Sequence, residues 1–171
     1  RSAEMNQKME RALEIIESNL ARDVRNAYDF ELFRATAELA RHTSLLYLDL
    51  AALEDAIEEA HQNRFVSYQI SGDKLDEAVK IAETILERRE RVYNDLVQTW
   101  EKTTLPKGYS TPEKPFFHQQ DRARHFAFRT PDMSYLIYDE QLLDLEGYLE
   151  DLREYAAWYR KEIIPDRLAG Q

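Results

Sequence analysis

One long helix is predicted by residues 30–63, which read FELFRATAELARHTSLLYLDLAALEDAIEEAHQN. Its apolar positions recur in alternating steps of four and three, a pattern typical of the seam along which helices pack in a bundle. A second apolar row widens the stripe, so we expect this helix to contact more than one neighbour and to be central in the fold. The seam comprises Leu32, Thr36, Leu39, Thr43, Leu46, Leu50, Leu53, Ile57 and Ala60, and the second row includes Phe33, Ala37, Ala40 and Tyr47.

Three more helices are predicted around this one. The first covers residues 2–25, and after a break at residues 26–28 Asp29 is the expected N-cap of the long helix. A turn at residues 71–73, with Asp73 as N-cap, precedes the third helix, which ends near Glu101. The fourth runs from about Asp139 to Pro165, where proline stops it. Their core-facing stripes are expected at Met5, Met9, Leu13, Ile16, Leu20 and Val24; at Leu75, Val79, Ala82, Leu86, Arg89, Tyr93, Leu96 and Trp100, flanked by Ile85 and Val92; and at Leu142, Leu145, Leu149, Leu152, Tyr155, Tyr159 and Ile163.

The stretch between the third and fourth helices, residues 103–138, has a different composition. It holds four of the five prolines and many aromatic residues. Such a segment is far longer than the usual bundle connection and too aromatic for a disordered linker, so we expect an ordered crossover with a short helix over residues 119–128. The sequence therefore predicts an all-α fold: four long amphipathic helices in a bundle-like array, with a long aromatic crossover before the last helix. We interpret residues 1–171 as a single helical domain.

The charge and the cysteine content exclude several classes of function. Asp and Glu number 33 and Lys and Arg 23, for a formal charge of −10, which argues against nucleic acid or an anionic membrane as the main partner. The chain has no cysteine, which removes disulfides, cysteine zinc sites and thiolate nucleophiles. No apolar run approaches the roughly 18 residues of a membrane span, so no membrane insertion is expected.

Two groups of residues raise the question of a metal. Glu58 and His61 form one Glu-x-x-His motif, but a di-iron site in a helical bundle needs two such motifs. In the crossover, His118, Asp121 and His125 would share one face of a helix and offer two nitrogens and a carboxylate. The alternative is that these histidines pack among the neighbouring phenylalanines. We favour that alternative and expect neither a metal nor another cofactor.

Aromatic and basic residues supply the candidates for ligand binding. Trp100 and Trp158 offer flat rings on which a sugar could stack, although the seam position of Trp100 favours core packing. Arg122 and Arg129 lie among aromatic residues, where they could hold an anion or, as we expect, pair with the abundant acids. Tyr109 completes this candidate set. Because the sequence has no catalytic triad, phosphate loop or nucleophile elbow, we expect the chain to be non-catalytic.

The tract from Trp100 to Ile137 contains the runs WEKTTLPKG, FFHQQD and RHFAFRTPDMSYLI. It resembles the C-terminal helical region of bacterial family 20 glycoside hydrolases, the β-N-acetylhexosaminidase type. Residues 38–57, with His42 and the run YLDL, look like the helices that precede that region. The resemblance covers about two-thirds of the chain, and its specificity lies in the Trp100–Ile137 tract.

The resemblance implies an accessory role. In that family the chemistry is attributed to a TIM-barrel domain with an Asp-Glu pair, and this chain is too short for such a barrel of about 250 residues. We therefore expect a non-catalytic C-terminal module whose partner is the catalytic domain of the same polypeptide, with homo-oligomerisation as a further possibility. Residence in the bacterial periplasm or outside the cell is also implied by the resemblance. The alternative is a stand-alone helical protein–protein interaction domain.

Overall fold

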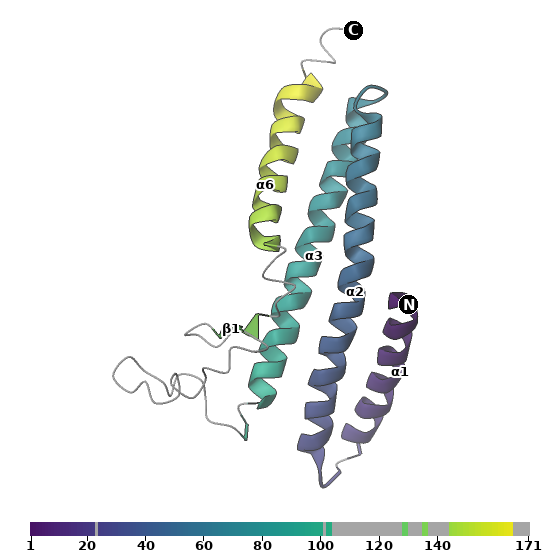
Figure 1. Cartoon of the computed structure of the whole chain (residues 1–171), viewed down its shortest axis with the longest axis vertical. Helices are drawn as coiled ribbons and strands as arrows, with labels where there is room; N and C mark the ends of the chain where they lie inside the picture. Colours follow the sequence, from purple (N-terminus) through teal and green to yellow (C-terminus); the bar gives the residue numbers. More distant parts are fainter. Residues whose placement is uncertain (23, 101, 104–127, 130–134, 137–143, 166–171) are drawn as a thin grey trace, which may run out of the picture. The chain divides into compact units, whose positions relative to one another are not determined.

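The computed structural model describes residues 1–22, 24–100, 102–103, 128–129, 135–136 and 144–165. The fold is all-α and bundle-like, which confirms the predicted class, and residues 101–144 separate the third helix from the last (Figure 1). Among the described residues, no helix combines the length and apolar character needed to cross a bilayer. The elements are α1 (Ser2–Leu20), α2 (Ala27–Asn63), α3 (Tyr68–Trp100), the antiparallel two-residue strands β1 (Phe128–Arg129) and β2 (Tyr135–Leu136), α6 (Leu145–Trp158) and the π-helix η2 (Tyr159–Ile163).

The described residues belong to two compact units. Unit 1 contains those of residues 1–8, 41–89 and 145–171, and unit 2 contains those of 9–40 and 90–144. The long helices α2 and α3 supply residues to both units. Most of the predicted crossover, including residues 119–127 of its expected short helix, lies outside the described residues, and Phe128 at its expected end belongs to β1.

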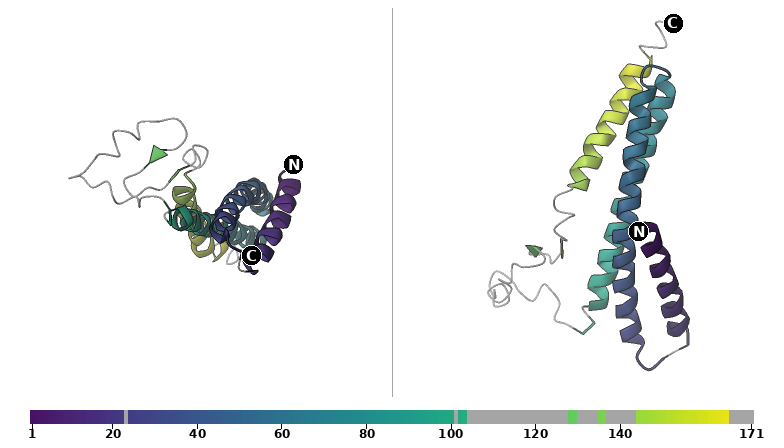
Figure 2. Two further views of the ribbon diagram at one scale, coloured as in Figure 1. Left: turned by 90° about the horizontal axis from the view of Figure 1, so that it is seen from below. Right: turned by 45° about the vertical axis from the view of Figure 1, so that its right-hand side comes forward.

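Unit 1 is built from α2, α3 and α6 with η2. In Figure 1 and in the right-hand view of Figure 2, α6 lies along the part of the bundle formed by α2 and the first half of α3. Ion pairs such as Arg153 with Glu83 and Arg160 with Asp76 fix an antiparallel register between α3 and α6 with η2. Small residues at the contact let the helices approach closely. The core clusters consist of Leu53, Ala56, Ala60, Leu75, Ala78, Leu152, Ala156, Tyr159 and Ile164.

Unit 2 pairs α1 with the first part of α2. Leu13 and Ile16 of the predicted α1 stripe are buried with Ala37, and Met9, Leu20 and Phe30 pack against them. Arg34 of α2 lies 3.7 Å from Glu17 of α1 and 3.3 Å from Asp95 of α3, and Lys102 bonds Glu31. Two of the predicted boundaries need correction. Helix α1 ends at Leu20, before Val24, and α2 begins at Ala27 rather than after Asp29 because the carbonyl of Asn26 accepts the N–H groups of Asp29 and Phe30.

The predicted turn at residues 71–73 is wrong, because these residues lie inside α3. The helix begins at Tyr68, and the Ser67 hydroxyl accepts the N–H of Ile70 as a cap would. Ser71 is buried, and its hydroxyl donates to the Ala60 carbonyl of α2. A Cβ atom at Gly72 would lie 2.9 Å from Cδ1 of Ile164. Both small residues therefore serve close packing between helices rather than a turn.

Burial along α2 and α3 differs in part from the predicted stripes. In the second row of α2, Ala37 is buried, but Phe33, Ala40 and Tyr47 are exposed. In α3 the most buried positions include Ala78, Ile85 and Val92, the last two being those predicted to flank the stripe. Trp100, predicted for the core, has 49% of its surface exposed. The seam positions Thr36 and Thr43 are also exposed.

The last helix begins later than predicted and changes its winding. Asp144 has φ 39°, in the left-handed region that Asp tolerates better than most residues, so a helix cannot run through it and α6 starts at Leu145. The N–H of Ile164 donates to the carbonyl of Tyr159, five residues back. This π-turn adds a residue to the spacing, so Ile164 rather than Ile163 is buried beside Tyr159. Tyr155, also predicted for the stripe, is exposed, and Ala156 takes its place in the core.

Candidate functional site

Most of the predicted crossover candidates, namely Tyr109, His118, Asp121, Arg122 and His125, lie outside the described residues. The backbone of Arg129 pairs with Tyr135 in the short sheet. Trp100 belongs to unit 2 and Trp158 to unit 1, and each is about half exposed.

The Glu-x-x-His motif of α2 faces solvent. Glu58 and His61 are exposed; Glu58 accepts a hydrogen bond from Gln62, and His61 Nδ1 lies 3.1 Å from Nη1 of Arg64. In the part of the chain that the structure describes, no three or more His, Asp or Glu side chains gather in a way that would hold a metal ion. The motif is therefore part of the solvated surface of unit 1.

A polar cluster that the sequence analysis missed lies between α2 and α3 in unit 1. Arg88 donates from Nε to Nδ1 of His42 at 3.3 Å and from Nη2 to a carboxylate oxygen of Asp49. His42 has 1% of its surface exposed. Only His42 of this cluster is fully buried, since the Asp49 side chain has 28% of its surface exposed, and the hydrogen bonds of Arg88 tie α3 to α2.

The end of unit 1 that contains η2 is held by charge. Arg160 donates hydrogen bonds to Asp73 and Asp76 of α3, and Lys74 pairs with Glu59 and Glu77. Hydrogen bonding from Arg160 lowers the pKa of Asp73, and the same acid is the main cause of the raised pKa of Arg160. The Arg160 pairs fix η2 on α3, so the rest of α6 is presented in a defined orientation, and the pair of Lys74 with Glu59 joins α3 to α2.

Helix α6 has two unlike flanks on either side of its buried face. On one flank, Arg153 donates to Glu83 from Nε at 3.1 Å and from Nη2 at 2.6 Å, and Glu146 lies 3.6 Å from Arg89. We call this side the paired flank. It docks α6 on α3 through complementary charges.

The other flank carries Tyr148, Asp151, Tyr155 and Trp158. Their spacing of three, four and three residues places them on one strip of the helix, which we call the α6 strip. Tyr155 and Trp158 have 50% and 48% of their surfaces exposed, and their ring centroids are 5.6 Å apart. Tyr155 also lies 6.3 Å from the ring of buried Tyr159, which anchors the pair to the core. Tyr148 has 39% of its surface exposed, and the burial of the remainder raises the pKa of its phenol.

Acidic side chains accompany these rings. Asp151 and Glu154 are exposed, and neither forms an ion pair with any residue that the structure describes. The cations between residues 144 and 165 are all engaged elsewhere: Arg153 with Glu83, Arg160 with Asp73 and Asp76, and Lys161 with Glu162. The α6 strip and the adjacent Glu154 therefore form an exposed surface of aromatic rings and of carboxylates that have no counter-charge among the described residues.

The sequence analysis singled out Trp158 from this strip and missed the other members. Tyr155 was assigned to the core stripe, and Tyr148 and Asp151 were not considered. The signal that could have found the strip is the spacing of Tyr148, Tyr155 and Trp158 beside the leucine stripe of the same helix.

Comparisons with protein-family models, with curated proteins and with solved structures found no match to this chain.

Proposed function

We propose that this chain is a non-catalytic helical module that works through contact with another protein surface. The observation that carries the proposal is the α6 strip, because half-exposed Tyr155 and Trp158 stand together on a helix whose orientation is fixed by ion pairs. Clustered exposed aromatic side chains are typical of interaction sites, since their burial contributes much of the binding energy. The Arg88 cluster, by contrast, is more buried, and its printed hydrogen bonds join α2 and α3 within unit 1.

The proposed parent is a carbohydrate-active enzyme. The support is the resemblance of the Trp100–Ile137 tract to the C-terminal helical region of family 20 glycoside hydrolases. On this proposal the partner surface is the catalytic domain of the same polypeptide, the chain supports that domain or its assembly, and the protein resides in the bacterial periplasm or outside the cell. The alternative is a stand-alone helical interaction domain, which would use the same surface toward a separate protein.

Two readings test this proposal. The first is the coding sequence upstream of the Arg1 codon. An open reading frame that encodes alternating strands and helices with an Asp-Glu pair would support the accessory module. A start codon a few residues upstream would support the stand-alone alternative. The second is hydrolysis of p-nitrophenyl N-acetyl-β-D-glucosaminide by the 171-residue chain. We expect no hydrolysis above that of buffer, and full hexosaminidase activity would show the non-catalytic assignment to be wrong.

A further inference from the structure

We propose that the α6 strip is a docking surface for a cationic segment of the proposed partner surface, with arginine or lysine side chains stacked on Trp158 and Tyr155 and paired with Asp151 and with the adjacent Glu154. The inference rests on the proposed interaction function and adds the chemistry of the partner.

The charge of the last helix specifies the sign of the partner. Residues 144–165 contain six acids and three bases, and the described pairs occupy all three bases. Asp151 lies between the rings of Tyr148 and Tyr155 along the strip, and Glu154 is adjacent. An apolar helix docked here would remove these carboxylates from water without a counter-charge, which is costly. A cationic segment would instead neutralise them.

The rings favour the same kind of partner. A guanidinium or ammonium group is attracted to the face of an aromatic ring, and tryptophan and tyrosine are good acceptors for it. The chain already contains such a contact, because the guanidinium of Arg64 lies 4.6 Å from the ring centroid of Phe65. A partner arginine over Trp158 would repeat this arrangement, with a carboxylate one helical turn away.

A second copy of this chain does not have the positive charge that the α6 strip requires of its occupant. Each copy has a formal charge of −10, so two copies that meet at an acidic strip would repel each other. The occupant that matches the strip is therefore a different protein segment that carries a local excess of arginine or lysine.

The test uses the full chain with Trp100→Phe. The sequence has two tryptophans, so Trp158 is then the only one, and the emission of the chain reports on Trp158 alone. The probe is a peptide of alternating arginine and alanine residues, and a glutamate–alanine peptide of equal length is its counterpart. We expect a saturable change in Trp158 emission with the arginine peptide at low salt, weakened as salt rises. The glutamate peptide should produce no change.

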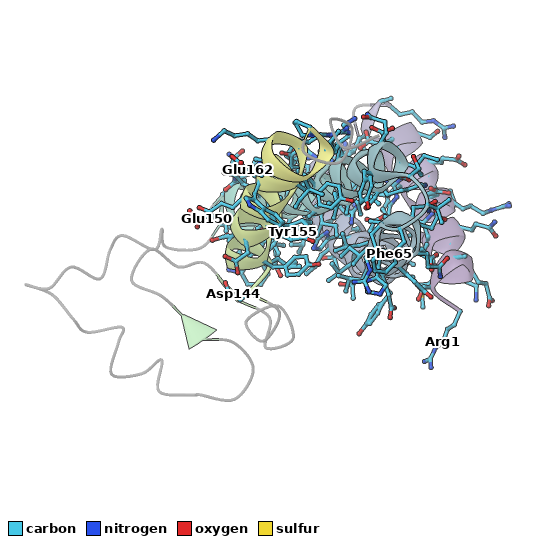
Figure 3. All side chains as sticks on the ribbon, turned by 90° about the horizontal axis from the view of Figure 1, so that it is seen from above. Arg1, Phe65, Asp144, Glu150, Tyr155 and Glu162 are labelled. Atoms are coloured by element: carbon cyan, nitrogen blue, oxygen red, sulfur yellow. The ribbon has the colours of Figure 1, made fainter. Side chains whose placement is uncertain are left out.

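Matched variants distinguish binding at the α6 strip from attraction of the peptide to the overall negative charge of the chain. In the same background, Asp151→Asn should weaken binding by about fivefold, since it removes one pairing carboxylate. Asp55→Asn makes the same charge change at an exposed position of α2 in unit 1 and should leave binding within about twofold. Figure 3 labels Tyr155 of the α6 strip and also Glu150, which both variants leave unchanged.

Three results would overturn the docking proposal: no emission change with the arginine peptide, an equal change with the glutamate peptide, or equal weakening by the two charge variants. None of these would bear on the gene sequence or the hexosaminidase assay, so failure of the docking proposal is distinguishable from failure of the proposed function.

Discussion

The two flanks of α6 both carry charged residues, but these residues have different roles. On the paired flank, Arg153 and Glu146 meet opposite charges on α3, so their charges are already satisfied within unit 1. On the α6 strip, Asp151 has no described counter-charge and stands between exposed aromatic rings. A charged and aromatic helix surface can therefore be assigned a role only after its partners inside the chain are known. One flank holds the helix in place, and the other has no counter-charge among the residues that the structure describes.

The largest effect should come from the buried face between these flanks. Leu152 is buried in a cluster with Leu53, Ala56 and Ala78, so Leu152→Ala should lower the free energy of unfolding by about 2–5 kcal/mol through lost contacts and a residual cavity. Urea denaturation followed by circular dichroism measures it. Trp158→Ala on the open strip is the control and should cost much less. Equal losses for the two variants would show that the strip is part of the core.

A smaller loss is expected where η2 approaches α3. Gly72→Leu should destabilise the chain by about 1–3 kcal/mol, because the side chain would be forced against Ile164 and Arg160. Gly72→Ala should be close to neutral, since about 1 kcal/mol of helix propensity offsets the shift of two side-chain ends. Thermal unfolding of both variants checks this, and a stabilising Gly72→Leu would contradict the close packing.

The paired flank should make a modest but measurable contribution. A double-mutant cycle with Arg153→Ala and Glu83→Ala should give a coupling energy of about 0.2–1 kcal/mol, as for other exposed ion pairs. The Asp151→Asn variant has no such partner among the described residues and should leave stability unchanged. A larger loss from Asp151→Asn than from Glu83→Ala would reverse the assignment of the two flanks.

The smallest effect is expected in acid. The pKa of Asp73 is held below its usual value of 3.8 chiefly by its hydrogen bond from Arg160. A carboxyl whose pKa is lower in the folded chain stabilises the fold above its unfolded pKa, and that stability is lost as the pH falls through the folded pKa. The urea midpoint of the parent chain should therefore fall further between about pH 5 and about pH 2.5 than that of Asp73→Asn. Parallel curves would contradict the role of this pair.

The sequence was sufficient for the fold class and for many core positions, because helical periodicity reports burial directly. Leu13, Leu53, Leu75 and Leu152 were predicted for the core and are buried. The errors arise where tertiary packing overrides local signals. Ser71 and Gly72 have turn chemistry but allow close helix packing, and the π-turn at Tyr159 shifts burial from Ile163 to Ile164.

The site was harder to predict than the fold. Periodicity placed Tyr155 among core residues because the strip and the buried face adjoin on the same helix, and only the structure separates them. Pairing across helices has no local signature either. The contact of Arg88 with His42 and Asp49 joins residues about 40 positions apart, and nothing in the spacing of either helix specifies it.

The most direct test of the central claim is calorimetric titration of the Trp158→Ala chain with the arginine–alanine peptide, alongside its urea midpoint. We expect the affinity to fall about tenfold, since the main stacking surface is removed, while the midpoint stays near that of the parent chain. An unchanged affinity, or a loss of affinity that comes only with a large fall in the midpoint, would contradict the claim that the strip serves binding rather than stability.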